Sequence, residues 1–170
     1  MNMQVTPLVN SSIVSLIQAQ ARREVMASQT YRSLALWACM QSYEGSEKFL
    51  RCYSADELDH RDRWLEFMGG YVNVLPETPG FETIKLEPAN LADCFAQALM
   101  MEQSQTTAIS QIVQAADKAN DQAVATFAQW FLKKQIRRVT KLLKITGMIA
   151  MASTDIAALM AVDCMIAKRC

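Results

Sequence analysis

The stretch Glu57-Leu58-Asp59-His60 holds the only histidine of this 170-residue chain. On a helix, side chains three residues apart lie on one face, so Glu57 and His60 would present a carboxylate oxygen and an imidazole nitrogen side by side. The stripe to which both belong is otherwise apolar or aromatic, and it runs Phe49, Tyr53, Glu57, His60, Trp64, Phe67. Such a stripe is typical of a helix face turned towards a core, and it predicts a buried polar site.

The composition predicts an ordered, globular chain with few turns. Hydrophobic residues make up 51% of it, with only 5 glycines and 4 prolines. A chain of this length is enough for about one domain with a sizeable core. We therefore expect one domain over residues 1–170.

Several partners and compartments are not expected. The 17 basic and 17 acidic residues cancel, and no basic run is long enough to neutralise several phosphates, which argues against nucleic acid. No apolar run reaches 18 residues, and Met1–Ala19 lacks a basic segment before its apolar part, so neither a membrane span nor a secretory signal is expected. The cysteines are odd in number and lack C-x-x-C spacing, which predicts free thiols and a cytoplasmic protein. They are Cys39, Cys52, Cys94, Cys164 and Cys170.

Periodicity and turn residues predict four long helices and a short fifth. The first two span about residues 9–42 and 46–70, with Ser46 as a plausible N-cap of the second. Asn90 caps the third, and the break at Asn120-Asp121 separates it from the fourth. The fourth ends near Gly147, and after it Ser153 or Thr154 can cap the fifth, which covers about residues 154–168.

The connections predict the topology. Residues 71–89 form a long linker containing Pro76, Pro79, Gly80 and Pro88, and the only segment in it that suggests a strand is Thr83–Leu86. Short connections join the other consecutive helices, and a crossover between parallel helices needs a long one. The predicted fold class is all-α: an antiparallel four-helix bundle over about residues 9–148, with a long crossover between helices two and three and a short C-terminal fifth helix.

Every predicted bundle helix carries polar residues on its inner stripe. The interval from Glu24 to Glu57 is 33 residues, and the interval from Glu102 to Gln135 is also 33. Two similar helical hairpins would therefore bring these four residues together in the middle of the bundle. Carboxylates converging in a dry core repel one another and are costly to ionise, and a pair of metal cations removes that cost. Carboxylate oxygens with one imidazole suit iron or manganese and also accept zinc. The alternative is a set of ordinary buried polar residues, with Arg138 paired to Glu102 and His60 bonded to Glu24.

At these residues the chain resembles the non-heme ferritins of bacteria and animals, over nearly its whole length. The matching segments are Glu24–Ser28 with Tyr31 and Trp37, Phe49–Arg51 with Asp56, Glu57 and His60, Met101–Gln103, and Phe127–Phe131 with Gln135. Generic di-iron enzymes carry a second E-x-x-H on the last bundle helix. Here that position holds Gln135 and Arg138, and glutamine there is typical of ferritins.

The resemblance implies a ferroxidase centre that oxidises Fe(II) to Fe(III) with dioxygen or peroxide. Glu24 and His60 would bind the first of two irons, with Glu57 bridging. Glu102 would bind the second, and Gln135 would lie beside it. Tyr31 would be a hydrogen-bonding or redox neighbour, unless it is only a stacked core tyrosine.

The resemblance also implies an assembly that stores ferric mineral. It would be a cytoplasmic cage of 24 subunits, of one or more types, with the fifth helix lining four-fold pores. The apolar side chains of that helix would be buried between subunits; they are Ile156, Leu159, Met160, Val162 and Met165. Leu58 stands where bacterioferritins carry their heme-ligating methionine, so heme is not expected.

Departures from the family pattern leave a second hypothesis open. Lys134, Arg137 and Arg138 replace the carboxylates of a third iron site, which we expect to be absent, and Ala125 and Ala128 supply no acidic pair for a three-fold entry pore. Arg138 either extends to the cavity or occupies the place of the second cation. In the second case the chain is a cage subunit with impaired or absent ferroxidase activity. A small di-metal oxidase unrelated to storage is disfavoured, because the second E-x-x-H is missing.

Overall fold

The computed structural model describes residues 8–169 and is all-α. Its α-helices are α1 (Ser11–Met40), α2 (Glu44–Phe67), α3 (Leu91–Lys118), α4 (Gln122–Ala152) and α5 (Ile156–Ile166). A π-helical turn, η1 (Met68–Val72), extends α2, and a 3-10 turn, η2 (Ala167–Arg169), follows α5. Residues 8–169 contain no strand, including at Thr83–Leu86. The predicted fold class is confirmed.

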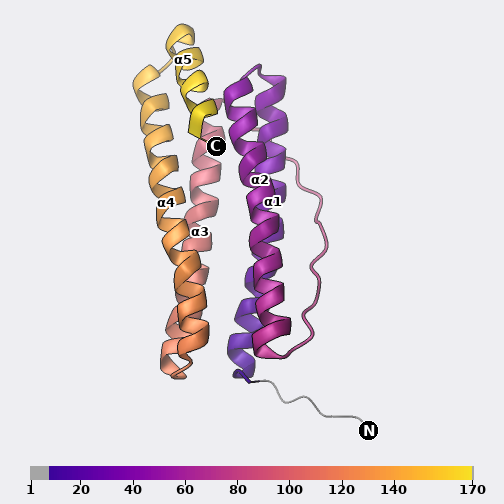
Figure 1. Ribbon diagram of the computed structural model, residues 1–170. Coiled ribbons are helices and arrows are strands. Elements are labelled where there is room, and N and C mark those ends of the chain that lie inside the picture. The colour runs from indigo at the N-terminus through magenta and orange to yellow at the C-terminus, as the bar shows by residue number, and fades with distance from the viewer. Residues whose placement is uncertain (1–7, 170) are drawn as a thin grey trace.

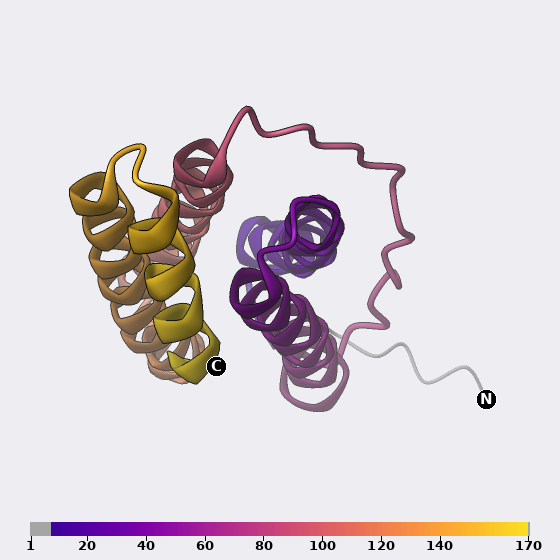
Figure 2. The same cartoon turned by 90° about the horizontal axis from the view of Figure 1, so that it is seen from above.

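The bundle consists of two helical hairpins, α1 with α2 and α3 with α4 (Figure 1). The crossover between α2 and α3 runs the length of the bundle on the side of α1 and α2 that faces away from α3 and α4 (Figures 1 and 2). Gln18 on α1 fixes it by donating to the carbonyl of Glu77 at 2.7 Å and accepting from the Glu77 N–H at 3.0 Å. An extended segment without strand partners is thus held by side-chain bonds.

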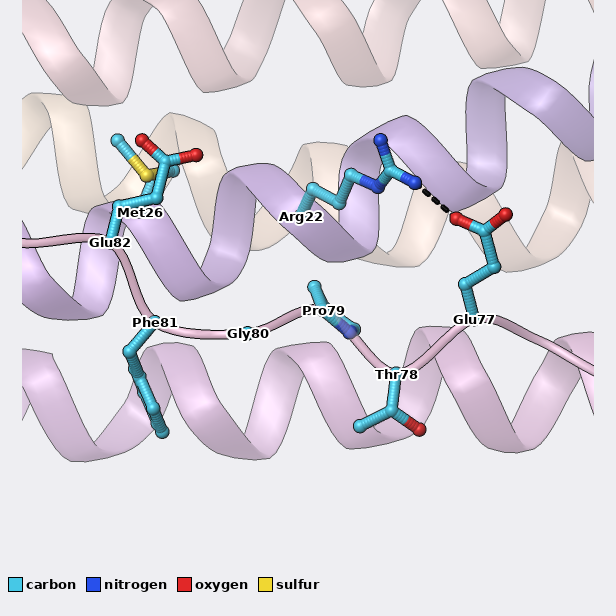
Figure 3. Close-up of a pocket in the computed structure, with 8 residues that line it drawn as sticks. All are labelled: Arg22, Met26, Glu77, Thr78, Pro79, Gly80, Phe81 and Glu82. Carbon is cyan, nitrogen blue, oxygen red and sulfur yellow. Dashed lines mark hydrogen bonds and ion pairs between the residues drawn. The ribbon is translucent and has the colours of Figure 1, made fainter.

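A surface cavity of about 370 Å³ lies between α1 and the crossover. Figure 3 shows Arg22 reaching the carboxylate of Glu77 at its rim, while Phe81 points away. None of the predicted metal ligands lines this cavity. The predicted ligands lie inside the bundle instead.

The helix caps agree with prediction at α3 and differ at two other helices. Asn90 caps α3 by accepting from the Asp93 N–H at 2.9 Å. The prediction of Ser46 as the cap of α2 is wrong, because α2 begins at Glu44 and the carboxylate of Asp163 on α5 accepts from the N–H groups of Gly45 and Ser46 at 2.8 and 2.7 Å. Asp155, rather than Ser153 or Thr154, caps α5.

Helix α4 continues past the expected end near Gly147 to Ala152. Glycine costs a helix interior about 1 kcal/mol, which flanking burial readily offsets. Ile145 and Ile149 on either side of Gly147 are both buried. Tertiary packing therefore overrides the local stop signal.

The apolar core forms two clusters, one towards each end of the bundle. The first contains Tyr31, Phe49 and Phe95 and extends onto α5 through Val162 and Ile166. The second contains Ile13, Trp64 and Phe131. The predicted polar residues, among them Glu24, Glu57 and Glu102, lie between the two clusters along the chain. No solvent competes there for their hydrogen bonds.

The cysteines differ from expectation at one described position. Cys39, Cys94 and Cys164 are free thiols. Cys52 is disulfide-bonded, so the expectation of a free thiol there is wrong. Cys170 lies outside the described residues. Within residues 8–169, no helix combines the length and apolar character that crossing a bilayer requires.

Candidate metal centre

A layer of buried polar side chains crosses the middle of the bundle, with every bundle helix contributing. The exposed fraction is 7% or less for all of its members, which are Gln20, Glu24, Glu57, His60, Glu102, Gln105, Gln135 and Arg138. No Cα atoms of α2 and α4 lie within 8 Å of each other among the described residues. Long side chains from these two helices therefore fill the space between them.

The structure brings Glu24, Glu57 and His60 together. One potential ligand atom from each lies within 4.8 Å of the other two. His60 directs Nδ1 at both carboxylates, 3.1 Å from Glu57 Oε2 and 3.9 Å from Glu24 Oε2. Two carboxylate oxygens and an imidazole nitrogen at this spacing can hold one divalent cation.

Glu102 and Gln135 form a second group beside the first. The amide of Gln135 donates to Glu102 Oε2 at 2.8 Å. Tyr31 donates its hydroxyl proton to Glu102 Oε1, while its ring packs edge-on against Tyr53 at 5.4 Å between centroids. Tyr31 thus lies next to the polar layer, and the geometry fits both a hydrogen-bonding neighbour and a stacked core tyrosine.

Arg138 lies between these two groups. Its Nη1 donates to Glu57 Oε1 and, at 3.2 Å, to Glu102 Oε1. Nη2 donates to Asp56 at 3.0 Å, and the guanidinium carbon lies 4.5 Å from the centre of the Tyr53 ring. The alternative in which Arg138 extends to the cavity and touches nothing reactive is wrong for this structure, because its planar fork of donors bonds to carboxylates of the layer.

Burial and the position of Arg138 together separate the pKa values of the three buried carboxyl groups. Burial opposes the charge on Glu57, but Arg138 and a hydrogen bond from His60 hold its pKa down at about 2. Burial and then the charge of Glu57 raise the pKa of Glu102 to about 7, despite Arg138. The same two causes raise the pKa of Glu24 well above its ordinary value. The positive charge of Arg138 thus stabilises the ionised form of Glu57. It does not do so for Glu24, whose pKa stays high.

Glu24 is held by residues that sequence reasoning did not identify. Gln20 and Trp64 donate to its Oε1 at 2.8 and 3.0 Å, and Gln105 donates to its Oε2 at 3.2 Å. The available signal was spacing, since Gln20 lies four residues before Glu24 and Gln105 three after Glu102. These donors orient the Glu24 carboxylate without neutralising it, so the group remains fit to bind a cation.

The outer edge of the layer is basic. The Lys134 ammonium lies 3.4 Å from His60 Nε2 and 4.4 Å from the centre of the Trp130 ring. Burial, followed by the charges of Arg138 and Arg63, lowers the pKa of Lys134. The carboxylate of Asp56 forms an ion pair with Arg138 at 3.0 Å. Basic groups thus occupy this edge of the layer, and the absence of a third iron site stays a prediction.

Comparisons with known proteins identify the family. The ferritin-like domain family matches residues 14–152, so the chain belongs to that family. It is 24% identical over 128 residues to bacterial non-heme ferritin of Escherichia coli O6:H1, covering 75% of this chain and 77% of that protein. It is 26% identical over 142 residues to ferritin BfrB of Mycolicibacterium smegmatis, covering 84% and 78%.

A solved structure confirms the fold. The open pore ferritin of Archaeoglobus fulgidus superposes with a TM-score of 0.89 over 94% of this chain and 97% of that one, at 20% identity. The predicted resemblance to non-heme ferritins is therefore confirmed, and membership of this family implies iron binding.

Proposed function

We propose that this chain is an iron-storage ferritin subunit that binds one ferrous ion at Glu24, Glu57 and His60, with Arg138 in place of a second cation. The observation that carries the proposal is the contact of one guanidinium nitrogen with both Glu57 and Glu102. These are the two carboxylates that the resemblance assigns to the second iron. A permanent positive charge between them disfavours a further cation there, because like charges a few ångströms apart repel strongly in a dry interior.

The proposed single site limits the redox chemistry. Reduction of dioxygen or peroxide by two electrons needs two ferrous ions, because each supplies one electron as it becomes ferric. A subunit that holds one ion supplies one electron, and the second must come from another site. We therefore propose slow ferroxidase activity, with Glu24, Glu57 and His60 binding the ion and Gln20, Trp64 and Gln105 orienting Glu24.

A second candidate is the two-iron ferroxidase centre that the resemblance implies. The observation that favours it is that Gln135 donates to Glu102, and that one nitrogen of Arg138 contacts both Glu102 and Glu57 of the first group. In this candidate Arg138 withdraws towards Asp56, whose side chain is 52% exposed, and leaves Glu57 and Glu102 to a second iron. Both candidates use the same residues, so they differ in the number of ions bound.

Counting metal ions separates the candidates. The assembled protein is titrated with ferrous iron under anaerobic conditions, and calorimetry gives the number of ions bound per subunit. We expect one ion at the buried site in the wild type and an equal or higher number in Arg138→Ala. Arg137→Ala is the matched control, since Arg137 is exposed and its replacement removes the same charge from the same helix. Two ions in the wild type would refute the single-site proposal in favour of the second candidate.

We also propose a cytoplasmic cage, with 24 subunits as the family resemblance implies. The outward side of α5 supports an interface between subunits, since Ile156, Met160 and Met165 are 78%, 44% and 48% exposed. Val162 and Ile166, by contrast, pack into the bundle. Removal of residues 153–170 should prevent assembly. An intact cage of normal solubility after this truncation would count against the proposal.

A further inference from the structure

We infer that Lys134 competes with metal for His60 and sets the concentration of metal at which the site fills. This inference rests on the proposed metal site and adds its regulation. The contact that points to it is the 3.4 Å separation of Lys134 Nζ from His60 Nε2, on the side of the ring opposite the carboxylates. His60 is the only imidazole of the chain, so no other histidine can replace it.

The hydrogen-bond directions explain the competition. In the metal-free protein, Nδ1–H donates to Glu57 and Nε2 accepts from the Lys134 ammonium. A cation held with Glu24 and Glu57 takes the lone pair of Nδ1, since that nitrogen faces both carboxylates. The neutral ring then carries its proton on Nε2, where the ammonium also presents only protons. Two donors now face each other, so metal binding must break the contact with Lys134.

The surroundings of Lys134 hold it in this competing position. Its ammonium lies 4.4 Å from the centre of the Trp130 ring, a favourable cation–π distance. Arg63 lies 5.1 Å from the same ring centre. Lys134 is nevertheless partly exposed, so its side chain can leave for solvent when a cation arrives. Charge repulsion also opposes metal binding while Lys134 stays in place, because its ammonium faces the imidazole that would bind the cation.

The adjacent residue provides a matched control. Lys133 is exposed and forms no hydrogen bond or ion pair with any other described residue. Lys133→Met removes the same charge from the same helix and leaves His60 untouched. Lys134→Met removes the competing donor, while Lys134→Gln also supplies an amide oxygen that can accept from Nε2–H.

The test is calorimetric titration of the assembled, metal-free protein with Co²⁺ at low and at physiological salt. We expect Lys134→Met to tighten binding at least tenfold and Lys134→Gln to tighten it by as much or more, with Lys133→Met within twofold of the wild type. Unchanged thermal midpoints of the metal-free variants would show that folding is not the cause. Tightening by Lys133→Met equal to that by Lys134→Met would overturn the inference, because it would reduce the effect to net charge.

Titration of His60→Ala distinguishes the role of Lys134 from the existence of the metal site. Wild-type binding that is lost in His60→Ala but unchanged in both Lys134 variants overturns the role of Lys134 alone. Binding that appears only in the Lys134 variants supports it strongly. No binding in any of these proteins overturns the metal site and, with it, the competition.

Discussion

The carboxylate of Asp163, near the end of the chain, accepts a hydrogen bond from the backbone N–H of Gly45 at 2.8 Å. A second oxygen of the same carboxylate accepts from the Ser46 N–H and from its hydroxyl. Asp163 is only 3% exposed. A charge from α5 thus satisfies the free donors at the start of α2, where the helix dipole also favours it.

Gly45→Ala should loosen α5. A Cβ at this position would lie 2.0 Å from the backbone carbonyl oxygen of Asp163, which cannot move without shifting the helix. We expect a cost of about 1–3 kcal/mol in the free energy of unfolding, typical of overpacking. Thermal unfolding measures it, with Gly147→Ala as the control, because that Cβ meets no atom within 4 Å and should stabilise α4. Equal midpoints for the two variants would contradict the close packing of α5 on α2.

Glu57→Ala and His60→Ala should weaken ferrous iron binding at least tenfold and lower the rate of the oxidation that depends on it, while assembly stays as in the wild type. Each change removes one of three atoms that converge on the proposed ion. Asp59→Ala is the control, since Asp59 is an exposed acid on the same helix. Stopped-flow absorbance and size-exclusion chromatography give the two readouts. Initial rates equal to those of the wild type in both variants would remove the site assignment.

Trp64→Phe should weaken metal binding through Glu24. The change keeps an aromatic ring stacked on Phe131 but deletes the N–H that donates to Glu24 at 3.0 Å. A hydrogen bond to a charged group contributes about 1.5–3 kcal/mol, which corresponds to roughly tenfold or more in affinity. Calorimetry with Co²⁺ measures the change. A normal affinity together with an unchanged thermal midpoint would show that the indole N–H does not orient the carboxylate.

Glu102→Gln should change how stability depends on pH. The pKa of Glu102 is about 7 in the folded protein, above the ordinary carboxyl value of 4.5. The folded state therefore binds more protons than the unfolded state between these values. The stability that Glu102 contributes is full below pH 4.5 and is lost as pH rises through 7.

The glutamine cannot ionise, so its advantage over the wild type should grow from pH 5 to pH 7, by up to about 1.4 kcal/mol per pH unit. Chemical unfolding at fixed protein concentration measures this difference. Glu82→Gln, an exposed control in the crossover, should follow the wild type at every pH. A pH dependence for Glu102→Gln parallel to that of the wild type would mean that Glu102 is already ionised throughout this range.

Much of the fold could be predicted because its signals are local. Apolar spacing located the helices, and the prolines after Val72 located the crossover. The cap of α2 could not be found in this way, since Asp163 lies 117 residues from the N–H group of Ser46 that it caps. Helix α4 continues past Gly147 for a similar reason, because the burial of Ile145 and Ile149 in the bundle outweighs the local preference.

The polar layer was predicted more completely than the direction of its longest side chain. Periodicity placed Glu24, Glu57, His60 and Glu102 on inner faces, but it could not say whether Arg138 turns inward or outward. That choice depends on the positions of carboxylates on other helices, which spacing along one helix does not encode. Lys134 was missed as a partner of His60 for the same reason, and the roles of the five predicted ligands stay predictions until metal is measured.

The attachment of Arg138 to the backbone has a consequence for how the subunit matures. The positive charge that faces Glu57 and Glu102 in the folded bundle is part of the chain itself. The buried charge of Glu57 is therefore offset within the polypeptide, and folding of the bundle does not depend on a bound cation for this purpose.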